Sequence, residues 1–339
     1  MSATKLNIAK IRNRIPLILM GVIDIFFHIN VSLLFSLSLA PLFPSCLPFR
    51  YTLPMHKTPD PSSIKALALD LDGTALLPDT SMGGRTEQCL RRLVARGMQV
   101  IICTGRSIEA SCRYYSTIGA QGPMVFFNGA EVAEVPDVKV IESRLMGLDV
   151  ADYGIDLARS MGVHFQMFLP PGRGPKREGP WEALVIDKMR PEAQMYQEHT
   201  GVRPVVADMK AALAEPGLEG CVKAAFITDP ALHDEIQRKM TARFGSRIYM
   251  ARTYPTFLEV MDVGASKGKG LKIAMALRGL KPQEVIACGD EENDLPMFAV
   301  AGCSAAPSSA KDEVRQAADF VFRPCAEEGL VVFLEELFG

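Results

Sequence analysis

The sequence lacks the usual signatures of zinc sites, disulfide frameworks and nucleic-acid binding. Its 5 histidines are scattered and form no H-E-x-x-H pattern, which argues against a zinc site. None of the 8 cysteines belongs to a C-x-x-C pair, and Cys103, Cys221 and Cys288 lie in apolar runs, so we expect reduced core thiols. Lysine and arginine total 37 against 39 acidic residues, which leaves neither a basic stripe for nucleic acid nor an acidic tail.

The chain has 339 residues and 48% hydrophobic residues, enough for two domains with real cores. From Ile64 onward, strand-like and helix-like segments alternate, which predicts a parallel sheet covered on both faces by helices. Residues 147–252 instead read as an α+β unit, and the apolar run 257–261 reads as a strand that resumes the first pattern. We therefore expect an α/β fold, with a Rossmann-like doubly wound core (63–146 and 253–339) and an inserted α+β cap domain (147–252).

Residues 1–54 differ from the rest of the chain. Basic residues up to Arg14 precede a mostly apolar run, 15–49, which is typical of a signal peptide or a membrane anchor. Asp24 interrupts this run, and a charge at the centre of a membrane span costs about 2.5–3.5 kcal/mol. Alternatively, the reading frame begins too far upstream and Met55 is the natural start. A cytoplasmic protein is expected, with membrane anchoring through this segment as the alternative.

Two carboxylates follow the first expected strand directly. Residues 64–69 are apolar except for Lys65, and Asp70 and Asp72 come at the end of this buried strand, just before Gly73. Two acids in this position are costly unless they have a partner, and ligands bind at the C-terminal ends of strands in open α/β sheets. A surface turn is the alternative, because Asp-Gly is common turn chemistry.

Two later strand ends carry polar groups suited to an anion. The strand at 98–103 leads into Thr104-Gly105-Arg106 before a helix, where a hydroxyl and backbone N–H groups would face an anion. A simple helix cap by Thr104 or Ser107 is the alternative. The strand at 124–127 ends in Asn128-Gly129, which is either a ligand contact or hairpin turn chemistry.

A lysine and a cluster of acids mark the later part of the chain. Lys267 lies at the expected start of a helix, where a cation is unfavourable unless an anion is close. The strand at 284–288 ends in Gly289-Asp290-Glu291-Glu292-Asn293-Asp294, whose carboxylates repel one another. Mg²⁺ would relieve this repulsion, because it prefers carboxylate and phosphate oxygens. A solvated lysine and a solvated acidic loop are the alternatives.

These groups follow separate expected strands, and parallel strands end at one edge of a sheet, so we expect them to converge. Together they supply a carboxylate nucleophile, a second acid, a hydroxyl, a cation and metal-binding acids, which are the groups that metal-assisted phosphoryl transfer needs. The ordered set resembles the haloacid dehalogenase (HAD) superfamily and, within it, the Cof-type phosphatases. The matching motifs are Asp70-Leu71-Asp72-Gly73-Thr74, Thr104-Gly105-Arg106, Ser266-Lys267-Gly268 and residues 289–294.

The resemblance covers residues 63–339 and implies a Mg²⁺-dependent phosphatase for a small phosphorylated metabolite, such as a sugar phosphate or a phosphorylated cofactor. Asp70 would form an aspartyl-phosphate and Asp72 would act as general acid and base. Thr104 and Lys267 would hold the phosphoryl oxygens. The implied metal ligands are Asp70, the backbone carbonyl of Asp72, Asp290 and, more indirectly, Asp294. The implied substrate contacts are Gly73, Gly105, Arg106, Asn128 and Asn293.

Other functions remain open on the sequence alone. A phosphotransferase or phosphomutase would use the same groups, and a non-catalytic phosphometabolite-binding protein would keep only the binding groups. Pro307-Ser308-Ser309-Ala310 departs from the family's usual loop, so no asparagine contact is expected there. Lys223 and Trp181 would face either a substrate or the core of the cap. The substrate and the oligomeric state cannot be deduced from these patterns.

Overall fold

The computed structural model describes residues 60–339, so the predictions made for residues 1–54 lie outside it. The first domain is built on a five-stranded parallel sheet with the order β16-β15-β14-β1-β2. Its strands are β1 (Ala66–Leu69), β2 (Gln99–Ile102), β14 (Val285–Cys288), β15 (Cys303–Pro307) and β16 (Phe320–Phe322). β1 lies between β14 and β2, and its Leu69 lies opposite Cys288 of β14 and Ile102 of β2, so these three strands end at the same edge.

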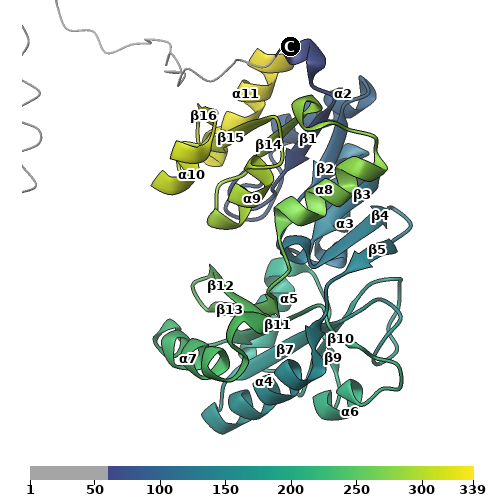
Figure 1. The fold of residues 1–339 in the computed structure, drawn as a ribbon, viewed down its shortest axis with the longest axis vertical. Coiled ribbons are helices and arrows are strands. Elements are labelled where there is room, and N and C mark those ends of the chain that lie inside the picture. Colours follow the sequence, from purple (N-terminus) through teal and green to yellow (C-terminus); the bar gives the residue numbers. More distant parts are fainter. Residues whose placement is uncertain (1–59) are drawn as a thin grey trace, which may run out of the picture. The chain divides into compact units, whose positions relative to one another are not determined.

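Helices cover both faces of this sheet (Figure 1). Leu67 and Leu69 belong to the same apolar cluster as residues of α2 (Gly84–Ala95), α3 (Ile108–Ile118) and α11 (Gly329–Phe338). Ala66 and Ala68 point the other way and pack in a cluster with residues of α8 (Lys267–Leu277), α9 (Leu295–Phe298) and α10 (Asp312–Ala317). Alternate residues of one strand thus face two helical layers, which confirms the predicted doubly wound core.

A small antiparallel sheet lies next to the parallel one. It consists of β3 (Gly122–Phe126), β4 (Glu131–Val135) and β5 (Lys139–Ser143), and a single parallel bridge between Cys103 and Val125 connects it to the strand region of β2. Asn128 lies in the hairpin turn between β3 and β4 with a φ of 56°, and this position is compatible with a ligand contact as well. Asparagine tolerates this left-handed conformation better than most residues.

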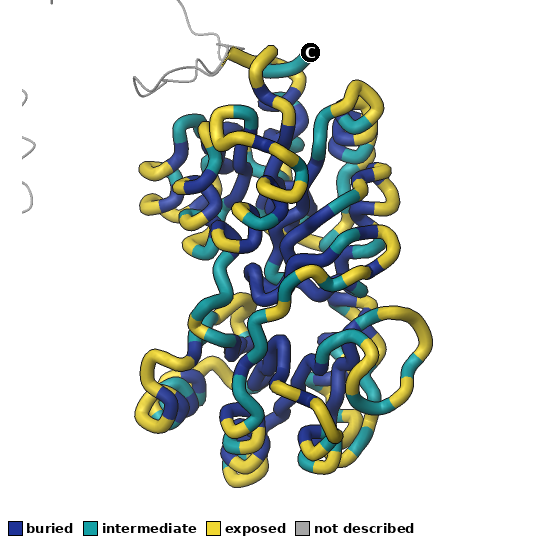
Figure 2. Tube along the Cα trace, turned by 45° about the vertical axis from the view of Figure 1, so that its right-hand side comes forward, coloured by how far each residue is buried: buried dark blue, intermediate teal, exposed yellow. Residues whose placement is uncertain are grey.

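The second domain is the predicted α+β cap. Its six-stranded sheet has the order β12-β13-β11-β7-β8-β9, and the four middle strands of this sheet are buried along most of their length. Figure 2 shows the buried segments in the interior of this domain. The strands are β7 (His164–Leu169), β8 (Ala183–Ile186), β9 (Val205–Val206), β11 (Lys223–Ile227), β12 (Ile248–Tyr254) and β13 (Phe257–Asp262). The helices are α4 (Leu148–Met161), α5 (Pro191–Thr200), α6 (Met209–Leu213) and α7 (His233–Phe244), and β6 (Met146–Gly147) pairs with β10 (Gly220–Cys221).

The predicted boundary between cap and core is wrong at residue 252. β13, which we expected to resume the core, pairs antiparallel with β12 and β11 in the cap sheet, so the cap continues to Asp262. Five of the six residues of β13 are buried in succession, a pattern that an apolar strand shows in either sheet. The chain returns to the core only at α8.

The described cysteines agree with the prediction of reduced thiols. Cys103, Cys221 and Cys288 are buried free thiols. Cys89 and Cys303 are also free and buried, and Cys112 and Cys325 are free and half-buried. No helix in this same part of the chain is both long and apolar enough to cross a membrane. The proposed membrane anchor concerns residues 1–54 and remains a prediction.

Candidate active site

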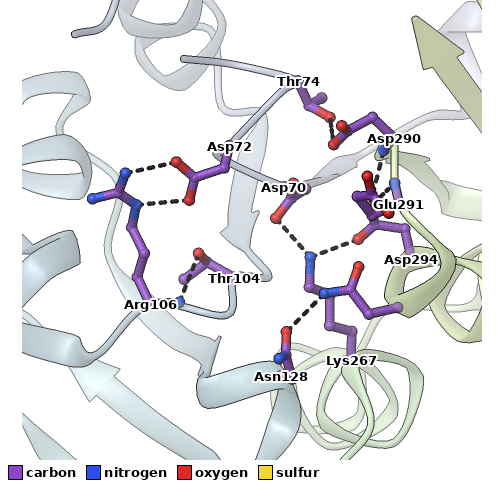
Figure 3. Close-up of polar contacts among 11 residues, drawn as sticks. Asp70, Asp72, Thr74, Thr104, Arg106, Asn128, Lys267, Asp290, Glu291 and Asp294 are labelled. Carbon is purple, nitrogen blue, oxygen red and sulfur yellow. Dashed lines mark hydrogen bonds and ion pairs between the residues drawn. The ribbon is translucent and has the colours of Figure 1, made fainter. Parts of the chain in front are cut away.

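A cleft of about 690 Å³ lies between the C-terminal edge of the parallel sheet and the cap sheet. Its core wall contains most of the residues that the sequence singled out: Asp70, Asp72, Gly73, Gly105, Arg106, Asn128, Lys267 and Asn293. Thr104, Asp290 and Asp294 do not line the cleft but lie behind this wall, where they contact Arg106, Thr74 and Lys267, respectively. The structure therefore brings the predicted groups together, most of them from strand ends of the core (Figure 3).

Lys267 is the centre of the site. Its Nζ donates to Asp70 Oδ1 and to Asp294 Oδ1, both at 2.6 Å, and all three side chains are buried. Burial disfavours the charged lysine, but Asp294 and Asp70 outweigh it and raise the pKa of Lys267. Lys267 is the first residue of α8, where a cation is unfavourable unless an anion is close. In this structure the carboxylates of Asp70 and Asp294 are that anion.

Lys267 reaches the site by a route that the sequence did not reveal. We expected it at the end of a fourth strand of the parallel sheet, and this is wrong, because the preceding strand β13 belongs to the cap. The first turn of α8 delivers the lysine instead. Close packing makes this approach possible, since a Cβ at Gly268 would overlap the backbone carbonyl of Pro296, and one at Gly129 would overlap that of Ser266.

Asp290 completes a cluster of three carboxylates. Oxygens of Asp70, Asp290 and Asp294 lie within 4.8 Å of one another. Thr74 Oγ1 donates to Asp290 Oδ1 at 3.0 Å. Gly73 allows this approach, because its φ is 75° and a Cβ there would overlap the Asp290 carboxylate. Thr74 was part of the first motif, but its hydroxyl contact was not predicted from the sequence.

The three carboxylates have different electrostatic environments. Burial raises the pKa of Asp70 well above its usual range, with Asp294 and Asp290 adding to the effect and Lys267 opposing it. Burial and the charge of Asp294 raise the pKa of Asp290 to about 7. Asp294 instead uses Oδ2 to accept from the backbone N–H groups of Asp290 and Glu291, at 2.9 and 3.0 Å. The cluster therefore fits a hard divalent cation, which would offset the excess negative charge on Asp70 and Asp290.

Asp72 faces away from this cluster. Arg106 donates to it twice, from Nε to Oδ2 at 2.7 Å and from Nη2 to Oδ1 at 2.6 Å. Partial burial pushes the pKa of Asp72 upward, but the hydrogen bonds and charge of Arg106 outweigh it, so the pKa lies below its usual value. The side chain of Asp72 is 53% exposed, whereas that of Arg106 is buried. The carboxylate is thus ionised and accessible from the cleft.

The remaining predicted contacts form a polar rim around the carboxylates. Thr104 is buried and accepts the backbone N–H of Arg106 at 3.1 Å, and its own hydroxyl hydrogen has no acceptor among the described residues. Asn293 Nδ2 donates to Asn128 Oδ1 at 2.9 Å, and Asn128 Nδ2 is buried without a partner among the described residues. Ser107, not Thr104, caps α3, because its side chain accepts from the backbone N–H of Ala110. The Thr104 side chain therefore does not cap α3.

The cap wall of the cleft combines aromatic rings with an ion pair. The rings are those of Tyr196, His199, Tyr249, Tyr254 and Phe257. Lys223 lies in β11 and donates to Glu259 of β13 at 2.6 Å and to the backbone carbonyl of Gly105 at 3.2 Å. Lys223 therefore faces the cleft, one of the two alternatives left open. Glu259 was not singled out, because no local pattern reveals that it lies next to a lysine 36 residues earlier.

Comparison with known proteins agrees with this geometry. A family model described as haloacid dehalogenase-like hydrolase matches residues 67–334. The chain belongs to this family. The match extends from β1 to α11 and includes every motif that carried the resemblance, which confirms the family predicted from the sequence.

Relatives of this hydrolase are named as phosphatases. The 5-amino-6-(5-phospho-D-ribitylamino)uracil phosphatase of Bacillus subtilis is 29% identical over 281 residues, covering 80% of this chain and 97% of the relative. The HMP-PP phosphatase of Serratia proteamaculans is 26% identical over 239 residues, covering 69% and 80%. The predicted Cof-type subgroup and the class of enzyme, a phosphoric monoester hydrolase, are thereby confirmed.

Solved structures share the fold of this hydrolase. A haloacid dehalogenase-like hydrolase from Bacteroides thetaiotaomicron has a TM-score of 0.72 at 22% identity, covering 81% of this chain and all of the other. A putative HAD/COF-like hydrolase from Plasmodium vivax has a TM-score of 0.68 at 21% identity, covering 83% and 96%. At such identities the likeness supports the fold alone, a parallel-sheet core with a cap.

Proposed function

We propose that this hydrolase is a Mg²⁺-dependent phosphatase that cleaves a small phosphorylated metabolite through an aspartyl-phosphate on Asp70. The observation that carries the proposal is the joint contact of Lys267 with Asp70 and Asp294, beside Asp290, at the floor of the cleft. The phosphorylated small molecules in the names of the relatives support the substrate class.

Mg²⁺ would be held by Asp70 and Asp290, and would supply positive charge that lets an anionic nucleophile approach a phosphate. Asp294 would act indirectly, because both its oxygens already accept hydrogen bonds from Lys267 and from the backbone. Lys267 would orient Asp70 and, together with the metal, favour its ionised form, which burial opposes. Asp70 Oδ2 accepts no hydrogen bond from any described residue, so this oxygen is the one we assign as nucleophile.

The reaction then needs two proton transfers. In the first step Asp70 Oδ2 bonds to phosphorus, the ester P–O bond breaks, and Asp72 gives a proton to the leaving alkoxide. In the second step Asp72 takes a proton from water, which attacks the phosphorus and frees Asp70 with release of inorganic phosphate. General acid and base help of this kind is worth about 10²–10⁴-fold in rate.

The ion pair between Arg106 and Asp72 affects the first proton transfer, from Asp72 to the leaving alkoxide. Arg106 lowers the pKa of Asp72, so in this conformation Asp72 is better suited to accept a proton than to donate one. Donation to the leaving group therefore requires Arg106 to release at least one of its two bonds. Thr104, Asn128 and Asn293 would meanwhile contact the phosphoryl oxygens or the ester, together with backbone groups at Gly73 and Gly105.

Phosphate release from a panel of phosphorylated metabolites, with Mg²⁺ and with EDTA, tests the proposal. We expect metal-dependent release by the wild-type protein, and none by Asp70→Asn, whose thermal unfolding should stay close to that of the wild type because an amide replaces a buried acid of raised pKa. Activity in Asp70→Asn would exclude Asp70 as nucleophile. Release of phosphate only with an added alcohol acceptor would favour a phosphotransferase, and binding without release would favour a non-catalytic role.

A further inference from the structure

Every lysine and arginine that lines the cleft within residues 60–339 is already paired with a carboxylate. The pairs are Arg106–Asp72, Lys223–Glu259, Arg252–Asp234, Lys267 with Asp70 and Asp294, and Lys311 with Glu291 and Glu292. His199 also lines the cleft, and burial, aided by the charge of Arg106, lowers its pKa. A second negative charge on the bound molecule would thus meet no unpaired cation of the described cleft.

One of these pairs differs from the others because it lies on the cap and is almost fully buried. The side chain of Lys223 is 3% exposed and that of Glu259 is 7% exposed. The Lys223 ammonium also lies 5.4 Å from the ring centre of Phe127 and 5.7 Å from that of Phe168. Four fixed contacts therefore determine where Lys223 lies, and through it where the Glu259 carboxylate lies.

Glu259 has an unused acceptor. Oε1 accepts from Lys223, whereas Oε2 is buried and has no hydrogen-bond partner among the residues that the structure describes. A buried carboxylate oxygen without a donor costs about 1–3 kcal/mol or more, so a donor from a bound molecule would recover that free energy. The rings of Tyr254 and Phe257, 5.1 Å apart, and of Tyr196 beside them provide an apolar surface next to this acceptor.

We propose that the Lys223–Glu259 pair selects the leaving group: Glu259 accepts a hydrogen bond from an O–H or N–H of an uncharged alcohol, and the paired charges of the cleft reject leaving groups that carry a second anion. This inference rests on the proposed phosphatase function. The substrate class is therefore a phosphate monoester of a neutral, polyhydroxylated or N–H-bearing molecule, rather than a phosphorylated acid or a bisphosphate.

Two matched compounds test this selection, sorbitol 6-phosphate and 6-phosphogluconate. Both are open six-carbon chains with a phosphate at one end, and they differ at the other end, where a hydroxymethyl group replaces a carboxylate. We expect the wild-type protein to have a kcat/KM for sorbitol 6-phosphate at least about tenfold higher, because a charge-assisted hydrogen bond is worth about 1.5–3 kcal/mol.

Glu259→Gln and Lys223→Met should move this ratio in opposite directions. Glu259→Gln removes the carboxylate and leaves the Lys223 charge unpaired, so we expect the preference to shift by about tenfold or more toward 6-phosphogluconate. Lys223→Met leaves Glu259 uncompensated and should increase the discrimination against 6-phosphogluconate. Glu235→Gln is the matched control, because Glu235 forms an exposed pair with Lys239 on α7, and it should leave the ratio unchanged.

A merely structural role of the pair predicts a different result, since both variants would then lower kcat/KM for both compounds by the same factor. That outcome, or a wild-type protein that hydrolyses the two compounds equally well, would overturn the inference. A wild-type protein that releases phosphate from no compound of the larger panel would instead contradict the proposed function. If Glu259→Gln fails to fold, Lys223→Met alone still decides, because unchanged discrimination in that variant contradicts the inference.

Discussion

Replacing Asp290 by asparagine should stabilise the metal-free protein while removing its response to Mg²⁺. Asp290 lies beside two other carboxylates, and burial together with the charge of Asp294 raises its pKa from 3.8 to about 7. Because the pKa is higher in the folded protein, Asp290 is protonated there at pH values where the unfolded chain has already ionised. Asp290 therefore does not destabilise the folded protein below about pH 4, and the cost of its ionisation in the folded state grows as the pH rises to about 7.

The size of the effect follows from this difference in pKa. Each pKa unit corresponds to about 1.4 kcal/mol, so a rise from 3.8 to about 7 gives an upper limit of about 4 kcal/mol above pH 7. Asp290 is partly exposed, and solvent screening reduces such effects, so we expect Asp290→Asn to gain about 1–3 kcal/mol. Asparagine keeps an oxygen that accepts the hydrogen bond from Thr74.

Urea unfolding of both proteins at pH 4 and pH 8, each with EDTA and with Mg²⁺, measures this. In EDTA the variant should be the more stable protein at pH 8 and equal to the wild type at pH 4. Mg²⁺ should stabilise the wild type at pH 8 and the variant much less, because a ligand stabilises only the state that binds it. Asp152→Asn is the control, since Asp152 forms an exposed pair with Lys210 and its loss should change stability by less than about 1 kcal/mol. A variant that is less stable than the wild type in EDTA at pH 8, or that gains as much from Mg²⁺, would refute the reasoning.

Two further predictions concern other charged groups. Arg106→Met should raise the pKa of Asp72, because it removes both hydrogen bonds and the neighbouring charge, and should shift the pH–rate profile of phosphate release to higher pH; an unshifted profile would contradict the role of the pair. Glu131→Gln should stabilise the protein at pH 9 but not at pH 4, because burial and the charge of Glu182 raise the pKa of Glu131 to about 8 and its ionised form is therefore unfavourable in the folded state; equal gains at both pH values in urea unfolding would count against this.

The convergence of the motifs was predictable because it depends on local sequence. A buried apolar strand followed by polar residues has the same meaning wherever it occurs in a parallel sheet, so Asp70, Asp290 and Thr104 were placed correctly at one edge. The prediction that Lys267 lies next to an anion was also based on local sequence, since a cation at a helix N-terminus is unfavourable without one. The sequence did not reveal which anion, and in the structure Asp70 and Asp294 fill that role.

The errors arise where the information is not local. β13 reads as a buried strand, but its neighbours β12 and β11 make it part of the cap, and strand pairing is not encoded in one strand's apolar pattern. The partner of Lys223 depends on the same pairing, because Ala225 lies opposite Glu259 and Lys223 shares a face with Ala225. Glu259 could be identified only once the order of the cap strands was known.

The same long-range contact would connect the proposed leaving-group recognition to the proposed proton transfer by Asp72. Lys223 of the cap donates to the backbone carbonyl of Gly105, and the next residue, Arg106, holds Asp72. Gly105 packs closely against Asn128, since a Cβ there would lie 2.9 Å from Asn128 Oδ1. A leaving group that binds Glu259, and through it displaces Lys223, would therefore act on the backbone segment next to Arg106, which holds Asp72. Selection of the alcohol and its protonation would then depend on one backbone segment, and a substitution at either end of this path should change both.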